Sequence, residues 1–195
     1  MVTSSDWEKG ISYLAYREMV NDLVAAGKTT GEEQSEKLLN YTQMNVQRMR
    51  RWDKTAVINP DLHSLLQKVV PQKWLVLTEG WCGDVSQSLP TLVKMADASP
   101  HIELRVLLRD ENNALMNMYL TNGGKSIPKL IAVDTDFNEL FNWGPRPVAA
   151  QTLITTLKQV ETPFEELSEQ LHKWYATDKN AHLQAEFIEL LQSFL

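Results

Sequence analysis

The feature that most constrains the fold is an alternation of strand and helix patterns between residues 60 and 160. Trp74-Leu-Val-Leu-Thr78 is a short continuous apolar run, which is typical of a strand covered on both faces. Further strands are expected at 102–108, 129–133 and 139–143, the last two joined as a hairpin through Asp134-Thr-Asp136. Helices are expected between and after them, at 83–98, 111–120 and 148–160. This order predicts an α/β fold whose sheet starts parallel and ends in an antiparallel edge.

Helical patterns also occupy both ends of the chain. Residues 6–26 read as one helix, and a capping box between Thr30 and Glu33 predicts the start of another that runs to about Trp52. Asn59 and Pro60 then begin a helix, since asparagine caps well and proline is tolerated in the first turn. Two more helices are expected near 163–176 and 181–194.

These patterns divide the chain into a central domain with helical additions. We expect an N-terminal helical extension at 1–58 that packs on the core, a central domain at 59–161, and a C-terminal helical extension at 162–195.

Net charge, apolar runs and cysteine count indicate which partners and which cellular compartment to expect. The net charge of -6 argues against a nucleic-acid partner or an anionic membrane, which would favour a basic surface. No apolar run approaches the roughly 18 residues that span a bilayer, and the first residues lack the pattern of a signal peptide. The single cysteine cannot form an internal disulfide. We therefore expect a cytoplasmic protein with no nucleic-acid or membrane partner.

The single cysteine lies at a chemically favourable position. Trp81-Cys82-Gly83-Asp84 falls between the first strand of the central domain and the helix that follows it. A thiol at such a joint lies beside the free N–H groups and the positive end of a helix, a setting that favours the reactive thiolate. Pro90 lies inside that helix, eight residues after Cys82, and Ile127-Pro128 precedes the third strand.

In order and spacing, these motifs resemble the thioredoxin family. Trp-Cys-Gly, the helix proline, Ile-Pro before the hairpin and Trp143-Gly144 after the last strand all match, over roughly residues 60–160. The resemblance implies a thioredoxin-like mixed sheet flanked by helices, with Cys82 as nucleophile and Pro128 as a cis-proline beside it. It also implies that the backbone of Ile127 pairs with an extended substrate, and that Trp81, Trp143 and Gly144 line the same surface.

The departures from that pattern define a monothiol variant. Val85 occupies the position of the resolving cysteine, so a mixed disulfide cannot be released from within the motif. Asp84 replaces the usual proline; its charge complements the helix start but disfavours a neighbouring thiolate. Val76 replaces the family's buried aspartate, and Glu79 is the candidate substitute for proton transfer. We expect the helix start to prevail and Cys82 to titrate below the free-thiol pKa of about 8.5.

Basic residues and histidines add few further site candidates. Lys125, Lys129 and Arg146 flank the expected cleft and are candidates for binding a carboxylate such as that of glutathione, although a solvated role is the favoured interpretation. The run of Arg48, Arg50 and Arg51 is interpreted as a solvated helix face. The histidines lack metal-ligand spacing, so no metal site is expected; they are His63, His101, His172 and His182.

These residues support three functions from different classes. The first is a monothiol thiol–disulfide oxidoreductase or redox-responsive protein, in which Cys82 reacts with protein or low-molecular-weight disulfides and an external thiol resolves the product. The second is a redox-inactive binding or adaptor module that recognises an extended peptide. The third is a glutathione-dependent protein resembling monothiol glutaredoxins. No cofactor is expected, with glutathione as a candidate co-substrate, and the oligomeric state is left open.

Overall fold

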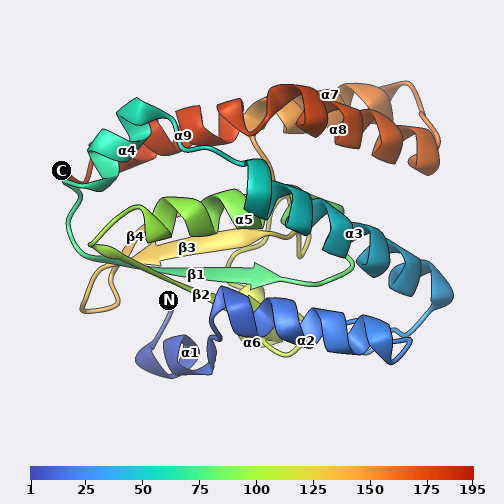
Figure 1. Cartoon of the computed structure of the whole chain (residues 1–195), viewed down its shortest axis with the longest axis horizontal. Coiled ribbons are helices and arrows are strands. Elements are labelled where there is room, and N and C mark those ends of the chain that lie inside the picture. Colours follow the sequence, from blue (N-terminus) through green and yellow to red (C-terminus); the bar gives the residue numbers. More distant parts are fainter.

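The computed structural model describes all residues, 1–195, and is built on a mixed sheet (Figure 1). The strand order is β2-β1-β3-β4. The strands are β1 (Gln72–Thr78), β2 (Ile102–Leu108), β3 (Lys129–Val133) and β4 (Glu139–Trp143). β1 pairs in parallel with β2, whereas the β1–β3 and β3–β4 pairs are antiparallel. The predicted sheet, with a parallel start and an antiparallel edge, is confirmed.

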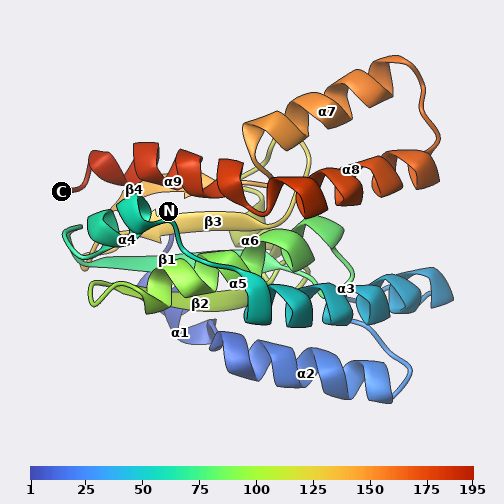
Figure 2. The ribbon, with the colours of Figure 1, turned by 45° about the horizontal axis from the view of Figure 1, so that its top comes forward.

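Helices cover the sheet on both sides (Figures 1 and 2). In Figure 1, α1, α2 and α6 lie below the sheet, and the remaining helices lie above or beside it. The helices are α1 (Ser4–Lys9), α2 (Tyr13–Ala25), α3 (Glu36–Thr55), α4 (Pro60–Leu66), α5 (Gly83–Asp97), α6 (Asn113–Met116), α7 (Val148–Gln159), α8 (Phe164–Asp178) and α9 (Ala181–Gln192). None of them combines the length and the apolar character needed to cross a membrane.

One continuous hydrophobic core joins the terminal helices to the sheet. It includes Trp7 of α1, Met49 of α3, Trp74 of β1 and Phe187 of α9. Trp74 and Phe187 pack with ring centroids 5.3 Å apart, so α9 is held on β1 by aromatic contact. A separate small cluster joins α7 to α8 and contains Ala150, Ile154, Leu171 and Tyr175.

The prediction of a single N-terminal helix over 6–26 is wrong, because the helix is interrupted between α1 and α2. A Cβ atom at Gly10 would lie 2.8 Å from the Cβ atom of Arg105, so glycine permits a close approach to β2. Ile11 then exchanges two backbone hydrogen bonds with Val106, at 2.9 and 2.8 Å. Ser12 caps α2 with its side chain. Tertiary pairing with β2 therefore overrides the local helical pattern.

The capping box expected at Thr30 is also absent. The Thr30 hydroxyl instead accepts the backbone N–H of Gly80, at 2.9 Å, and α3 begins later, with Ser35 as its cap. A reciprocal capping box is found at Thr3 and Asp6. The segment before α3 is thus tied to the loop that precedes Cys82.

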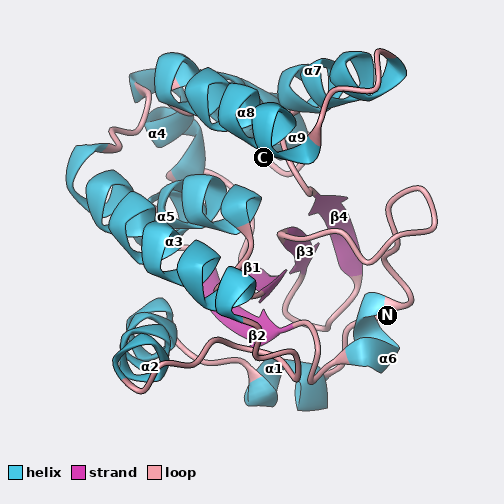
Figure 3. Cartoon of the chain, turned by 90° about the vertical axis from the view of Figure 1, so that its right-hand side faces the viewer, coloured by secondary structure: helices cyan, strands magenta, loops and turns pink.

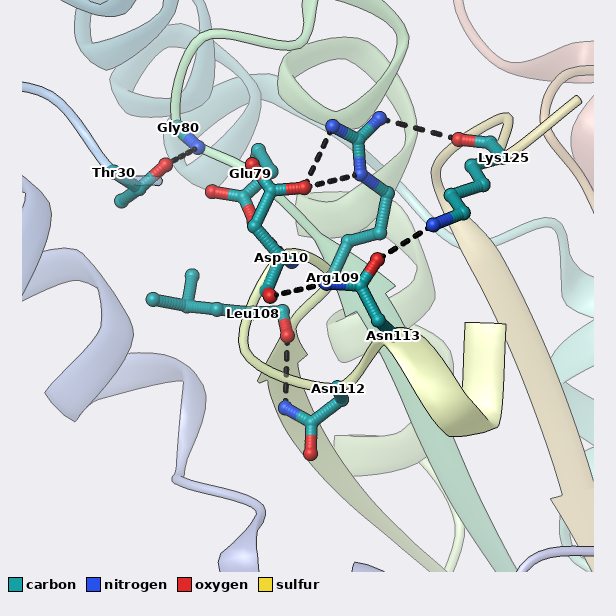
Figure 4. A network of polar contacts seen from close by, with 9 residues as sticks. All are labelled: Thr30, Glu79, Gly80, Leu108, Arg109, Asp110, Asn112, Asn113 and Lys125. Carbon is teal, nitrogen blue, oxygen red and sulfur yellow. Dashed lines mark hydrogen bonds and ion pairs between the residues drawn. The ribbon is translucent and has the colours of Figure 1, made fainter. Parts of the chain in front are cut away.

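The helix expected at 111–120 is reduced to the single turn of α6. The side-chain amide of Asn112 donates to the carbonyl of Leu108, and the amide of Asn113 donates to the carbonyl of Asp110 (Figure 4). Such side-chain bonds to nearby backbone groups compete with helix formation. Near the end of the predicted helix, the Tyr119 hydroxyl donates a hydrogen bond to Glu139 on β4, at 2.7 Å. This bond attaches the segment after α6 to the sheet.

Candidate functional site

Cys82 lies at the N-terminus of α5, beside a cis peptide bond between Ile127 and Pro128. Its Sγ donates a hydrogen bond to the Ile127 carbonyl, with a sulfur–oxygen distance of 3.2 Å. Pro90 lies inside α5, as expected. The predicted proximity of Cys82 to a cis-proline at Pro128 is therefore confirmed. A second cis bond, Gly144–Pro145, was not anticipated.

The expected low pKa of Cys82 is wrong. The pKa of its thiol is raised to about 12, mainly by burial and next by the negative charge of Asp84. Backbone N–H groups of Asp84 and Val85, and the charge of Arg146, act in the opposite direction but are weaker. The helix start alone cannot offset the removal of the thiolate from water. At neutral pH the resting thiol is protonated.

Asp84 is buried and bound by side chains from two other segments. The guanidinium of Arg146 donates to both of its carboxylate oxygens, at 3.2 and 2.6 Å, and the hydroxyl of Tyr175 on α8 donates at 2.7 Å. Such a two-point pairing is the strong geometry for arginine and carboxylate. Arg146 is therefore not the solvated residue that the sequence suggested. Tyr175 was missed because nothing near Cys82 in the sequence points to it.

A pocket of about 410 Å³ opens next to Cys82, between α3 on one side and α7–α8 on the other. Figure 3 shows these helices flanking the N-terminal end of α5. Trp81, Cys82, Gly83 and Asp84 contribute to its lining. The walls are mainly apolar and include Leu38, Tyr41, Met44, Ile154, Phe164, Leu167 and Leu171. At the rim, the ammonium of Lys37 on α3 lies 5.2 Å from the ring centre of Phe164 on α8.

Two polar residues of the pocket, Arg48 and His172, were not identified as site residues. The expectation that the whole arginine run is solvated is wrong for Arg48, which is half-buried and lines the pocket, whereas Arg50 and Arg51 are exposed. Arg48 donates to the side-chain carbonyl of Asn45, at 2.8 Å. Helical spacing separates these arginines, but it does not say which one faces a distant helix.

His172 of α8 rests on the first turn of α5. A Cβ atom at Gly83 would lie 2.9 Å from its Nε2, so glycine makes this approach possible. Its pKa is lowered to about 4 by burial and by the charge of Arg48, so the imidazole is neutral at pH 7. No sequence motif links His172 to Cys82, which lies far away along the chain.

Trp81 forms part of the pocket and is held from outside by Arg109, whose guanidinium lies 4.8 Å from its ring centre. Arg109 also pairs with Asp110, at 2.7 Å, and donates to the carbonyl of Lys125, at 3.2 Å (Figure 4). The ammonium of Lys125 bonds to Asn113, at 2.7 Å. Arg109 and Lys125 thus connect the segment after β2 to the segment before β3, next to Trp81.

Glu79 is fully buried beneath the same loop. One carboxylate oxygen accepts the backbone N–H of Asp110, at 2.9 Å, and the other has no hydrogen-bond partner. Burial raises the pKa of this carboxyl. Its hydrogen-bond partner is the Asp110 backbone rather than the thiol of Cys82, so the geometry does not provide direct proton exchange between Glu79 and Cys82.

The remaining candidate residues are placed unequally. Ile127 and Pro128 are buried beside Cys82.

Trp143 does not reach the pocket; its indole N–H donates to Glu186 of α9, at 2.7 Å, and its ring packs on Phe187. Gly144, at φ +118°, passes so close to Pro128 that a Cβ atom would lie 2.1 Å from the Pro128 carbonyl oxygen.

Lys129 is likewise withdrawn from the pocket. It is buried, and its ammonium bonds to the carbonyl of Gly144, at 3.3 Å. Burial lowers its pKa. It is therefore neither solvated nor placed to bind a ligand beside Cys82.

Comparisons with known proteins agree with this architecture. Two crystal structures are similar to the chain, each with a TM-score of 0.56 and 19% sequence identity: an HIV epitope scaffold and a protein of unknown function from Pseudomonas aeruginosa. The chain and the scaffold are covered to 90% and 98%, and the chain and the Pseudomonas protein to 93% and 99%. At this identity the likeness concerns the fold. No curated protein matches the chain.

A family model described as thioredoxin matches residues 31–158. The match includes α3, the loop with Cys82, the cis-proline and all strands of the sheet. The matched segment includes the connection between β1 and α5, which contains Cys82 and carries the resemblance in sequence. The chain belongs to the thioredoxin family.

Proposed function

We propose that this protein is a ligand-binding member of the thioredoxin family that takes a small molecule into the pocket beside Cys82 and keeps the cysteine protonated. The observation that carries the proposal is the pairing of an apolar-walled pocket with a thiol whose pKa is raised to about 12. Thiolates, not thiols, attack disulfides, so a thiol of this kind is a poor nucleophile at neutral pH.

The surroundings of Cys82 favour a small molecule over an extended peptide. Ile127 and Pro128, whose backbone would pair with a peptide, are buried, and the Ile127 carbonyl already accepts the thiol hydrogen. The pocket volume of about 410 Å³ is typical of sites for small ligands. Helices α3, α7 and α8 supply the apolar walls of this pocket.

The pH dependence of Cys82 alkylation tests this proposal. Because the chain has a single cysteine, iodoacetamide reports on this site alone. The native rate should rise about tenfold per pH unit up to pH ~10 without a plateau, since the thiolate fraction is still growing. Unfolded protein should show an ordinary thiol curve centred near pH ~8.5. A native plateau near neutral pH would contradict a protonated resting thiol.

The second candidate is monothiol thiol–disulfide exchange, and the position of Cys82 in an open pocket at a helix start favours it. In this reaction the Cys82 thiolate attacks a disulfide such as glutathione disulfide, forms a mixed disulfide and releases one thiolate. An external thiol then attacks the mixed disulfide and restores Cys82. Rapid adduct formation with glutathione disulfide at pH 7, seen by mass spectrometry, would support this candidate over the first.

A further inference from the structure

The pocket beside Cys82 contains a half-buried cation without a counter-ion, Arg48. The ion pairs of the chain all join other side chains, so the guanidinium of Arg48 has no carboxylate partner. Its protein partner is the neutral amide of Asn45. Arg146, the other arginine of the lining, is neutralised by Asp84. A half-buried, uncompensated charge at a pocket wall is a natural place for one anionic group of a ligand.

A hydrogen-bond chain orients a second donor beside Arg48. The indole N–H of Trp52, which can only donate, reaches the side-chain carbonyl of Gln87 at 2.6 Å. The amide nitrogen of Gln87 must then donate to Nδ1 of His172, at 2.9 Å. Nδ1 is therefore the acceptor, and the proton of the neutral imidazole lies on Nε2. The Nε2–H of His172 is thus a donor at the pocket lining, next to Gly83.

The remaining walls are suited to a hydrocarbon body. Apolar side chains of α3 face those of α7 and α8 across the pocket, and several of them are partly exposed, including Met44 and Phe164. Covering this surface with an apolar ligand removes it from water, which favours binding.

Resting on the proposed function, we propose that the pocket binds an organic monocarboxylate, with the carboxylate on Arg48 and the Nε2–H of His172 and the apolar body between α3 and α8. One unpaired guanidinium matches one negative charge and can bind a carboxylate at two points. A phosphate monoester carries about 1.5 to 2 negative charges, more than Arg48 alone compensates, and the other cation of the lining without an ion pair, Lys158, is exposed to solvent.

Calorimetric titration with octanoate, 1-octanol and octyl phosphate tests the carboxylate class. Octanoate should bind at least about tenfold more tightly than 1-octanol, since a charge-assisted hydrogen bond is worth this factor or more. It should also bind more tightly than octyl phosphate, because Arg48 compensates one negative charge and not two. Arg48→Met should abolish the preference, whereas Arg50→Met, an exposed arginine on the same helix, should retain it. His172→Leu should weaken octanoate binding more than His172→Gln, which keeps an N–H donor.

The outcomes separate this inference from the proposed function. If 1-octanol binds as tightly as octanoate, or if Arg48→Met keeps the preference, the carboxylate assignment is wrong while an apolar ligand pocket stands. If none of the probes binds, the carboxylate assignment is also wrong. The pH dependence of Cys82 alkylation then still tests, independently, whether the resting thiol is protonated. Protection of wild-type Cys82 from iodoacetamide by octanoate, but not by 1-octanol at equal concentration, is expected and needs no variant.

Discussion

The hydroxyl of Tyr175 donates a hydrogen bond to the carboxylate of Asp84, at 2.7 Å, across 91 residues of sequence. Asp84 belongs to the first turn of α5, next to Cys82, and Tyr175 belongs to the penultimate helix of the chain. Arg146 binds the same carboxylate. The position of the pocket wall formed by α8 therefore depends on a residue of the motif that contains Cys82.

Tyr175→Phe should lower the free energy of unfolding by about 1.5–3 kcal/mol, the usual worth of a hydrogen bond to a charged group. Both side chains are buried, so water cannot replace the lost donor. Urea denaturation measures the change. Tyr41→Phe on the pocket wall, whose hydroxyl makes no hydrogen bond within the protein, is the control and should change stability little. Equal effects of the two substitutions would contradict the role of the Tyr175–Asp84 bond.

Asp84→Asn should lower the pKa of the Cys82 thiol. The charge of Asp84 is the largest influence after burial, and its removal also leaves the positive charge of Arg146 unopposed near the thiol. Alkylation rates at fixed pH between 7 and 9 should rise in the variant. Asp97→Asn, at the exposed far end of the same helix, should leave the rates unchanged.

The same substitution carries a structural cost. Breaking a buried ion pair by removing one partner typically destabilises a protein by about 3–5 kcal/mol. The alkylation comparison is therefore made under conditions where circular dichroism shows the variant to be folded. A folded variant with wild-type rates would show that burial alone sets the acidity of Cys82.

Glu79→Gln should stabilise the protein more at pH 7.5 than at pH 4.5. Because burial raises the pKa of Glu79 in the folded state, its contribution is most favourable below the ordinary carboxyl pKa and is lost as pH rises through the raised value. Glutamine keeps an oxygen that can accept the N–H of Asp110 and carries no charge at any pH.

The measurement is the free energy of unfolding across this pH range. Glu103→Gln, on the exposed side of β2, is the control and should not reproduce the trend. A stability difference between Glu79→Gln and wild type that is constant with pH would mean that the buried carboxyl does not titrate there.

Gly144→Ala should destabilise the protein strongly. The added Cβ would lie 2.1 Å from the carbonyl oxygen of Pro128, a backbone atom that cannot move aside cheaply, and the residue has φ +118°. Gly123→Ala is the matched control, because Gly123 also has positive φ but no atom lies within 4 Å of the new Cβ. The control should cost about 1–2 kcal/mol from its backbone conformation alone.

Thermal unfolding should therefore show a clearly larger decrease in midpoint for Gly144→Ala than for Gly123→Ala. Similar decreases would contradict the close packing between Gly144 and Pro128.

Local sequence patterns were sufficient to predict the sheet and the position of Cys82. The apolar run at Trp74 is typical of a strand covered on both faces, and the turn residues around Asp134 favour the hairpin. The resemblance to the thioredoxin family, carried by Cys82, Pro90 and Pro128, then implied which segments meet at the helix start. These are short-range or motif-level signals, so tertiary contacts altered them little.

Local patterns failed where a distant contact competes with them. The helical pattern is interrupted at Gly10 because β2 packs against this residue. The Thr30 hydroxyl accepts the backbone N–H of Gly80 instead of capping a helix. The failures concern contacts that sequence spacing does not encode.

By itself, the sequence determined that a strand–cysteine–helix joint exists and that no second cysteine can resolve a disulfide there. Only the tertiary structure decided the environment of that joint. Asp84 is bound by Arg146 and Tyr175, and the helices that carry Arg48 and His172 form walls of the pocket beside the thiol. A helix dipole can be inferred from sequence position, but desolvation depends on which remote side chains exclude water. For Cys82 the desolvation prevails, and its pKa rises instead of falling.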